Sequence, residues 1–356
     1  MFRQKTTIIV GAGASCELGL PSGDALKGQI LRLLQPAIDR TYGFADRTMA
    51  ELMKLRIKPN MQDYQIKLKL EDEAAKRIRR GLPLALSIDN FLHSHQGNKE
   101  VEQLGKLAIA ICILRAESQS HLFKRISPTA REGEQDLKPM LTVNGNKLAK
   151  SWYPAFAQLL MSGVQRNNIA SAFDNLRFII FNYDRCLEQY IWMALQHYFN
   201  INEVEASKVL QNVSFIHPYG SLGPLPWLSN DRTIAFGNTA LTDLTDLTDV
   251  ATRIRTFTES VQSDVGGKVK DAVQWAETLI ILGFGYLDQN IQLLSPTSRN
   301  QSNRVFSTAY GVSEFDQNVM RDTMVALSGA YPNEAMIEVG SCRNLFDNFR
   351  LHLSLH

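Results

Sequence analysis

The chain has 356 residues, of which 44% are hydrophobic, and its formal net charge is +2. This length and composition can bury a large core in one or two domains, and the small net charge gives no electrostatic case for nucleic-acid binding. The polar start, the lack of an apolar run near the ~20 residues that span a bilayer, and four dispersed cysteines predict a cytoplasmic protein without a membrane segment.

The first candidate element is an apolar strand at residues 6–11 that runs into a glycine-rich turn. A helical pattern over 24–34 follows this turn. Glycine lets the backbone approach an anion, and the free N–H groups of a helix start favour negative charge, so this arrangement is typical of a pyrophosphate site. We expect a nucleotide to contact five residues in and just after this turn: Gly11, Ala12, Gly13, Ser15 and Pro21. A side chain larger than that of glycine at position 13 would occupy the space of the anion.

The turn also has a purely structural interpretation, because tight strand-to-helix connections need glycine without any ligand. It departs from the dehydrogenase fingerprint as well. Cys16 stands where the third glycine belongs, and no acidic residue closes a second strand about 20 residues further on. A nicotinamide-dependent dehydrogenase is therefore disfavoured.

Three later strands also end in polar or glycine-rich segments. The strand at 177–181 leads into Asn182-Tyr183-Asp184, the strand at 213–217 ends at His217 before Tyr219-Gly220-Ser221, and the strand at 278–283 leads into Gly283-Phe284-Gly285. In parallel α/β sheets, ligands bind outside the carboxyl ends of the strands. We therefore expect these segments to meet the first turn at one crevice.

The order of strands and helices predicts the fold class. Strands and helices alternate after residue 177, including strands at 305–309 and 335–338 and a helix over 250–276, whereas residues 45–127 show helical periodicity. Alternation of this kind implies a doubly wound parallel sheet. We predict one Rossmann-like α/β domain over 1–356, with a core at 5–35 and 175–340. A large helical insertion at 36–170 is expected beside the carboxyl edge of the sheet, and a C-terminal helix at 341–356.

The ordered motifs resemble the sirtuin fold, and more narrowly the sirtuin-like NAD hydrolases that act as effectors in bacterial anti-phage defence. The resemblance rests on Gly-Ala-Gly-x-Ser, Gly-Leu-Pro, Asn-x-Asp, a His near Gly-Ser, and a late Gly-x-Gly, in that order. It covers residues 5–35 and 175–340. Ser87 to Leu92 also looks like a segment that recurs in this subfamily, which adds Asp89 to the expected NAD-binding residues.

Two departures from deacetylating sirtuins stand out. The zinc ribbon with its two Cys-x-x-Cys pairs is missing, so we expect no zinc and no other metal site. In most sirtuins the catalytic His directly precedes the Gly, but here Tyr219 holds that place and His217 lies two residues earlier. Either His217 or Tyr219 can therefore occupy the catalytic position.

The resemblance implies that NAD is the substrate and that the chain cleaves its nicotinamide glycosidic bond. The leaving group is already cationic, so the site must position the ribose and present a water to an oxocarbenium-like transition state. Asn182 can hold the water, His217 can accept a proton near neutral pH, and Asp184 can stabilise positive charge. The expected binding residues beyond the first turn are Asp89, Tyr183, Tyr219, Gly220, Ser221, Gly283, Phe284 and Gly285.

Each catalytic candidate also has a structural alternative. Asn182 can make an Asx-turn, Asp184 can be the N-cap of the helix that follows, and His217 can be a structural strand-end residue. The repeated Leu-Thr-Asp triplets at 241–249 are interpreted as a capping or surface segment rather than a metal site.

Three function classes therefore stand. The first is an NAD glycohydrolase that depletes cellular NAD. The second is an NAD-dependent ADP-ribosyltransferase or deacylase, and the third is a nucleotide-binding sensor without catalysis. A protein that destroys free NAD must have an off state, so we expect a homo-oligomer, a separate regulatory or sensor protein, or both.

Overall fold

The computed structural model describes residues 2–38, 43–123, 147–229, 232–239, 245–297, 302 and 304–355. Within these ranges, six parallel strands form one sheet in the order β3-β2-β1-β4-β5-β6. The strands are β1 (Thr6–Val10), β2 (Leu176–Ile180), β3 (Phe215–Ile216), β4 (Thr278–Leu282), β5 (Arg304–Thr308) and β6 (Ala335–Glu338). This is the strand order of dinucleotide-binding sheets, whose direction of winding reverses between β1 and β4. The predicted Rossmann-like parallel sheet is confirmed.

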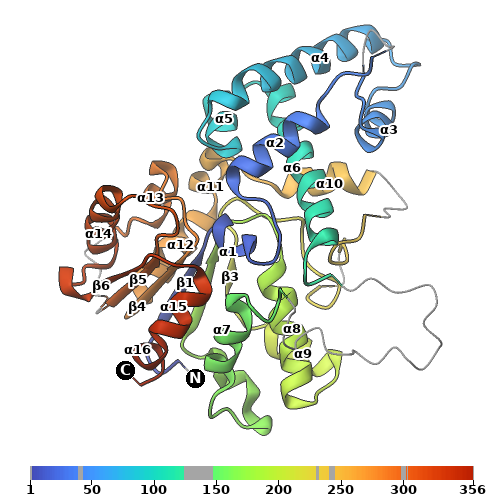
Figure 1. The fold of residues 1–356 in the computed structure, drawn as a ribbon. Coiled ribbons are helices and arrows are strands. Elements are labelled where there is room, and N and C mark those ends of the chain that lie inside the picture. The colour runs from blue at the N-terminus through green and yellow to red at the C-terminus, as the bar shows by residue number, and fades with distance from the viewer. Residues whose placement is uncertain are drawn as a thin grey trace.

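Helices surround the sheet and extend beyond it (Figure 1). In chain order they are α1 (Ala12–Cys16), α2 (Gly23–Leu33), α3 (Arg47–Arg56), α4 (Tyr64–Gly81), α5 (Ile88–Ser94), α6 (Lys99–Gln119), α7 (Trp152–Met161), α8 (Cys186–Phe199), α9 (Glu203–Leu210), α10 (Thr245–Arg253), α11 (Phe257–Gln262), α12 (Asp264–Trp275), α13 (Asp288–Leu294), α14 (Glu314–Ser328), α15 (Cys342–Asn348) and α16 (Arg350–Leu355). Short 3-10 helices lie at Leu82–Leu84, Arg166–Phe173 and Pro332–Glu334. None of the helices in the described ranges is long and apolar enough to cross a membrane.

The central strands are buried on both faces. Every residue of β1 and β4 is buried, which explains why both strands are unbroken apolar runs in the sequence. Alternate side chains enter two separate cores. Ile9 and Ile281 pack with α12 and α14 on one face, whereas Ile8 and Ile280 pack with α7, α8 and α15 on the other. The sheet is therefore doubly wound.

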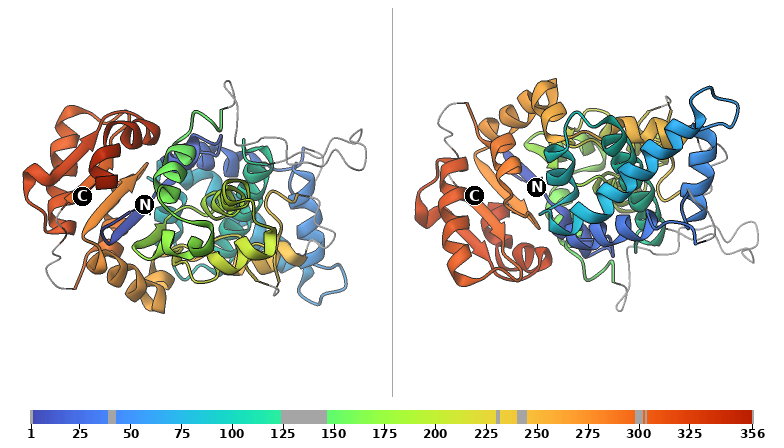
Figure 2. Two further views of the ribbon diagram at one scale, coloured as in Figure 1. Left: turned by 90° about the horizontal axis from the view of Figure 1, so that it is seen from below. Right: turned by 90° about the horizontal axis from the view of Figure 1, so that it is seen from above.

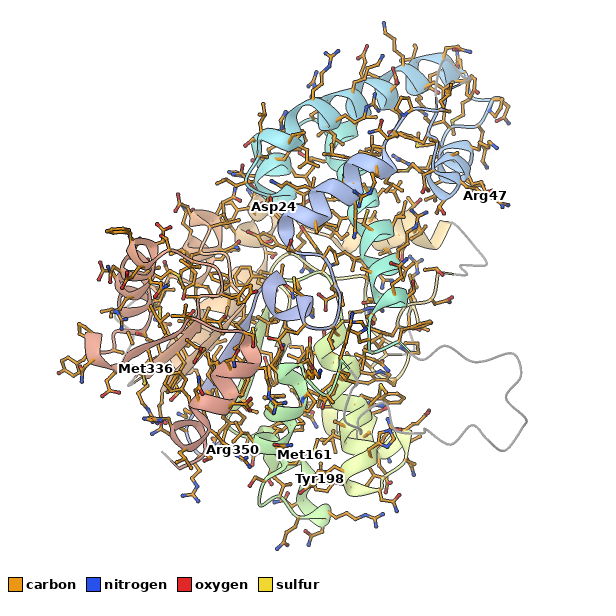
Figure 3. The ribbon with its side chains drawn as sticks, viewed as in Figure 1. Asp24, Arg47, Met161, Tyr198, Met336 and Arg350 are labelled. Carbon is orange, nitrogen blue, oxygen red and sulfur yellow. The ribbon has the colours of Figure 1, made fainter. Side chains whose placement is uncertain are left out.

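Helices α2 to α6 form a layer beyond the carboxyl edge of the sheet (Figure 1). α6 is the central helix of this layer and packs against α2, α4 and α10, the last of which comes from the second half of the chain. The layer extends away from β4–β6 (Figure 2). Asp24 lies where α2 leaves the sheet, and Arg47 marks the far end of the layer (Figure 3).

Three of the expected boundaries differ from the structure. α7 falls within the range 36–170 expected for the insertion, but it packs against α8 and α15 on one face of the sheet. The single helix expected over 250–276 is divided into α10, α11 and α12, because a capping box of Thr256 and Glu259 starts a new helix. The expected C-terminal helix is likewise divided, into α15 and α16.

The Leu-Thr-Asp triplets lie partly outside the described residues, since α10 begins at Thr245. Asp249 pairs with Arg232 at 3.0 Å and with Arg253 at 3.1 Å. No group of three or more His, Cys, Asp or Glu side chains in the described ranges can hold a metal ion.

Candidate functional site

Two glycine turns meet at the carboxyl edge, where the winding of the sheet reverses. Gly11 N–H donates to the Leu282 carbonyl at 2.8 Å, and Gly13 N–H donates to the Gly283 carbonyl at 2.9 Å. Gly283 has φ +54°, and a Cβ placed there would lie 2.0 Å from the Ala14 nitrogen. The turns after β1 and β4 are therefore packed backbone against backbone, which only glycine permits at position 283.

This packing changes the interpretation of Gly13. We expected a side chain at this position to occupy the space of a bound anion. Instead, a Cβ at Gly13 would lie 2.9 Å from the Cα of Gly283. Gly13 is thus required for contact between the two turns, so its replacement cannot serve as a clean test of ligand binding. Gly285 differs from both glycines, because a Cβ there would meet only the Leu287 Cγ at 4.0 Å.

Asn182 connects the end of β2 to the first glycine turn. Its Nδ2 donates to the Gly11 carbonyl at 3.1 Å and to Ser15 Oγ at 2.8 Å, and the residue is buried. Its Oδ1 is also buried and has no hydrogen-bond partner among the described residues. A buried amide oxygen without a partner is costly, so this atom is a strong candidate for contact with a ligand or water.

Asp89 brings the helical layer to the same edge. It lies in the first turn of α5, and its Oδ1 accepts a hydrogen bond from the Tyr183 hydroxyl. Burial raises the pKa of the Asp89 carboxyl to about 6, against the opposing effect of the Tyr183 hydrogen bond. Asp89 and Tyr183, which are 94 residues apart in the sequence, are therefore direct partners.

Aromatic rings fill much of the space beside these residues. The Phe181 and Phe284 ring centroids are 5.1 Å apart, and those of Phe181 and Tyr219 are 5.8 Å apart. The Tyr219 hydroxyl donates to Asn290 Oδ1 at 2.7 Å, and burial raises the pKa of this phenol far above its ordinary value. Tyr219 and Phe284 are thus held in the core by neighbouring rings and a side-chain amide.

Asp184 faces away from solvent at the start of α8. Its Oδ1 accepts the Cys186 N–H at 3.1 Å, so the side chain makes the Asx-turn that begins the helix. Burial raises the pKa of this carboxyl to about 6. Asp184 therefore makes an Asx-turn just before the helix and is not its N-cap as the structural alternative had it, because the N-cap of α8 is Arg185.

His217 makes contacts that the sequence did not predict. Its Nδ1 lies 3.2 Å from the Asn182 backbone carbonyl, and its Nε2 lies 2.6 Å from Glu188 Oε1. Burial lowers the pKa of His217, but the adjacent Glu188 carboxylate outweighs this effect and the net pKa is raised. Two acceptors require two N–H donors, so the imidazolium is favoured. This differs from the neutral proton acceptor that we expected.

Gly220 and Ser221 lie with His217 beside β3. Gly220 has φ +73°, and a Cβ there would lie 1.9 Å from the Arg253 carbonyl, so the turn packs on the end of α10. Gly220 and Ser221 line a cavity at this edge of the sheet. No hydrogen bond between described residues joins Ser221 to the Gly11 turn. Ala12 begins α1, and the half-buried Pro21 precedes α2.

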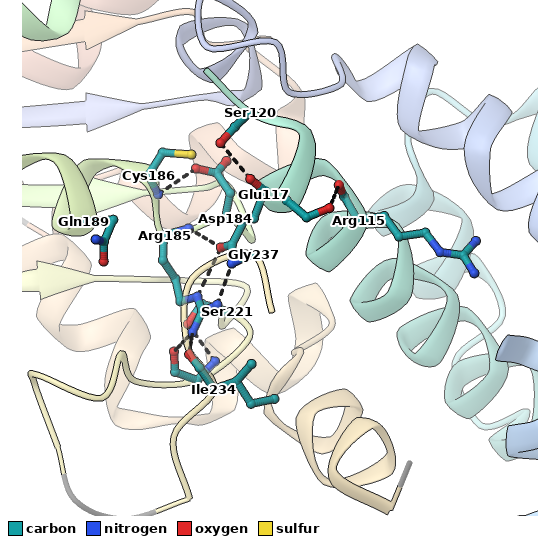
Figure 4. Close-up of polar contacts among 12 residues, drawn as sticks. Arg115, Glu117, Ser120, Asp184, Arg185, Cys186, Gln189, Ser221, Ile234 and Gly237 are labelled. Atoms are coloured by element: carbon teal, nitrogen blue, oxygen red, sulfur yellow. Dashed lines mark hydrogen bonds and ion pairs between the residues drawn. The ribbon is translucent and has the colours of Figure 1, made fainter. Parts of the chain in front are cut away.

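A buried ion pair between Glu117 and Arg185, which the sequence analysis did not predict, lies at the start of α8 (Figure 4). Arg185 Nη2 lies 2.7 Å from Glu117 Oε2, and Arg185 Nε donates to Glu117 Oε1 at 3.1 Å. Arg185 also donates to the Ile234 carbonyl at 2.6 Å, while Glu117 accepts the Gly237 N–H at 3.1 Å. The pair therefore ties α6 and the start of α8 to Gly223, Ile234 and Gly237.

The sequence does contain one indication that Glu117 and Glu188 are buried: each is a charged residue within an otherwise apolar stretch of helix. Glu117 follows the buried run 107–114 of α6, and Glu188 lies between buried Leu187 and Tyr190 on α8. A carboxylate at such a position requires a cationic or donor partner, since charged groups are seldom buried alone. The sequence does not say which cation supplies it.

The four cysteines, Cys16, Cys112, Cys186 and Cys342, are free thiols. Comparisons with known proteins supply no assignment: none of the protein-family models matches the chain, and no curated protein is significantly similar to it.

Proposed function

We propose that the protein is an NAD glycohydrolase that cleaves NAD to nicotinamide and ADP-ribose. The observation that carries the proposal is Asn182. Its Nδ2 is anchored to Gly11 and Ser15, and its buried Oδ1 has no partner among the described residues. This oxygen lies at the reversal point of a sheet whose strand order is typical of dinucleotide-binding proteins.

The chemistry of the neighbouring side chains supports the proposal. Cleavage of the nicotinamide bond needs a positioned water and stabilisation of positive charge at the ribose, but no acid to expel the cationic leaving group. A neutral amide such as Asn182 can hold the water and a ribose hydroxyl. Asp89 and Asp184, whose pKa values burial raises to about 6, are ionised at neutral pH and can stabilise the positive charge.

His217 takes a positioning role in this proposal. Its Nδ1 contacts the Asn182 backbone carbonyl, and Glu188 favours its charged form. It can act as a base only above its raised pKa. We propose that NAD contacts the Gly11–Ser15 turn and the exposed side of Gly285, and that the protein works as a regulated effector whose trigger is a partner protein or a change in oligomeric state.

The test is nicotinamide release from NAD by the purified protein, with and without an acyl-lysine peptide. Asn182→Ala is expected to lower turnover by on the order of 10²–10⁴-fold, the scale of a lost positioning group. Asn175→Ala is the matched control, because Asn175 also donates to two carbonyls, of Phe2 and Arg3, but lies at the opposite edge of the sheet. Release that requires the peptide would contradict the hydrolase and favour the transferase or deacylase.

A second candidate is a nucleotide-binding sensor without catalysis. It is favoured by the engagement of both His217 ring nitrogens and by the buried Tyr219 at the expected position of the base. NAD binding measured by calorimetry, without nicotinamide release even when candidate partner proteins are present, would support the sensor over the hydrolase.

A further inference from the structure

A cavity of about 380 Å³ lies beside β3, the edge strand on the α8 side of the sheet. Its wall is formed by the start of α8, the turn after β3, the end of α10 and the first half of α12. Its size falls in the range of small-molecule sites, which is about 300–1,000 Å³. Gly11 and Gly283 are not among its lining residues, whereas His217, Gly220 and Ser221 are.

The wall carries more positive than negative charge. Arg255 and Lys268 line the cavity, and neither forms an ion pair with a carboxylate in the described part of the chain. The other two arginines of the wall are already compensated, Arg185 by Glu117 and Arg253 by Asp249. Two uncompensated cations on different elements attract a group that carries about two negative charges.

Two buried atoms of the same wall have unused hydrogen-bonding capacity. Arg253 Nη1 and Glu188 Oε2 are buried, and neither has a hydrogen-bond partner among the described residues. Arg253 Nη1 lies against Gly223 of the same wall and has hydrogen atoms left to donate to an anion in the cavity. Glu188, only 4% exposed, can accept from a hydroxyl of the ligand through its free oxygen.

Much of the rest of the wall is apolar, although His217 and Ser221 also line the cavity. Phe215, Leu225, Leu228 and Val265 line the cavity together with the cations. An inorganic ion would leave this surface in contact with water, whereas a ligand with an apolar or flat body would cover it. The cavity thus combines cationic side chains with apolar ones.

We propose that this cavity binds a small organic phosphomonoester. A phosphomonoester carries about −1.5 to −2 charges at neutral pH and offers three acceptor oxygens, which matches the two cations without a carboxylate partner, Arg255 and Lys268, and the unpartnered nitrogen of Arg253. The cavity is large enough for such a group and an attached ring. This inference does not depend on the proposed cleavage of NAD.

The test is direct binding of phenyl phosphate to the full chain by calorimetry, because this probe has a phosphomonoester and a ring but does not resemble NAD. Arg255→Ala and Lys268→Gln are each expected to weaken binding at least tenfold. Lys270→Ala is the matched control, since Lys270 lies on the same helix but is not part of the cavity wall. Equal affinity in wild type, Arg255→Ala and Lys268→Gln would overturn the proposal.

Two further arms define the ligand. Benzoate and inorganic phosphate should each bind at least tenfold more weakly than phenyl phosphate; equal binding of benzoate would overturn the phosphomonoester, and equal binding of inorganic phosphate would overturn the role of the apolar wall. Asn182→Ala should bind phenyl phosphate as wild type does, which separates this site from the proposed NAD site. If a cavity variant fails to fold, binding can be followed in the wild-type protein by NMR. Phenyl phosphate should change the chemical shifts of the His217 ring, which lines the cavity. Unchanged shifts would contradict binding in this cavity.

Discussion

The Nε2 of His217 lies 2.6 Å from Oε1 of Glu188, and both side chains are largely buried. Glu188 is on the first turn of α8, so the pair joins this helix to the end of β3. On its other side, the same ring contacts the backbone carbonyl of Asn182. His217 therefore connects the end of β2, the end of β3 and the start of α8. Its charge depends on the carboxylate of Glu188, which lies six residues after Asn182 in the chain.

Replacement of Glu188 should change the titration of His217. In Glu188→Gln the carboxylate that raises the pKa is removed while burial, which lowers it, remains. The His217 pKa is therefore expected to fall, although the Asn182 carbonyl and the Asp184 carboxylate still raise it. Titration of the ring resonances by NMR measures this shift. An unchanged midpoint in Glu188→Gln would show that Glu188 does not control the charge of His217.

The same pair predicts how stability depends on pH. The folded pKa of His217 is above the unfolded value, so its stabilisation is fully present below pH about 6.5 and is lost as the pH rises through the folded pKa. The free energy of unfolding of wild type should therefore fall over this window, and the fall should be smaller in Glu188→Gln. Urea denaturation of both proteins at a series of pH values measures this difference. If the free energy of unfolding depends on pH in the same way in both, Glu188 does not set the pH dependence of stability through His217.

Asp184 predicts a separate effect at lower pH. Its folded pKa of about 6 is above the ordinary value near 3.9, so the buried protonated form is favoured and stability falls as the pH rises from about 4 to about 6. The shift corresponds to on the order of 2–3 kcal/mol. Asp184→Asn keeps an oxygen for the Cys186 N–H and should reduce this slope, while Asp89, whose pKa burial also raises to about 6, keeps its own contribution. A variant with the same slope as wild type in this interval would contradict the assignment.

The buried ion pair of Glu117 and Arg185 should be the most sensitive contact in the region. Glu117→Gln leaves the guanidinium, 1% exposed, without its counter-charge, and the free energy of unfolding is expected to fall by about 3–5 kcal/mol. The double variant Glu117→Gln with Arg185→Met should lose less than the sum of the two single variants, because neither charge is then left alone. Glu51→Gln, which breaks an exposed pair with Arg47, is the control and should hardly change stability. Additive losses in the double variant would show that the two residues act independently.

The parallel sheet could be predicted from the sequence because most of its strands are short apolar runs that alternate with helical segments after residue 177. The positions of β1 and β4 follow directly from Thr7–Val10 and Thr278–Leu282. The contacts of polar side chains could not be predicted in this way. Which cation reaches Glu117, and which carboxylate reaches His217, depends on how α6 and α8 pack against the sheet, and the spacing of residues along the chain does not contain that information.

The glycine turns show the same limit at the candidate site. Sequence reasoning treated the glycines at 13, 283 and 285 alike, as places where the backbone approaches a nucleotide. The structure separates them, because the first two are packed against each other and only Gly285 has open space at its Cβ position. A glycine required by neighbouring backbone and a glycine required by a ligand have the same appearance in a sequence.

This difference gives the sharpest test of ligand placement. Gly283→Ala puts a Cβ 2.0 Å from the Ala14 nitrogen at a positive φ, so the free energy of unfolding is expected to fall by about 2 kcal/mol or more. Gly285→Ala meets only Leu287 Cγ at 4.0 Å and should change stability by less than about 0.5 kcal/mol. Thermal and urea denaturation of the two variants measure this contrast.

Because Gly285 can be enlarged without disturbing the fold, Gly285→Leu should keep the stability of Gly285→Ala while weakening NAD binding at least tenfold, as measured by calorimetry. Undiminished NAD affinity in folded Gly285→Leu would exclude contact between NAD and the turn after β4, and the proposed position of the nucleotide would then be wrong even if Asn182 proved essential.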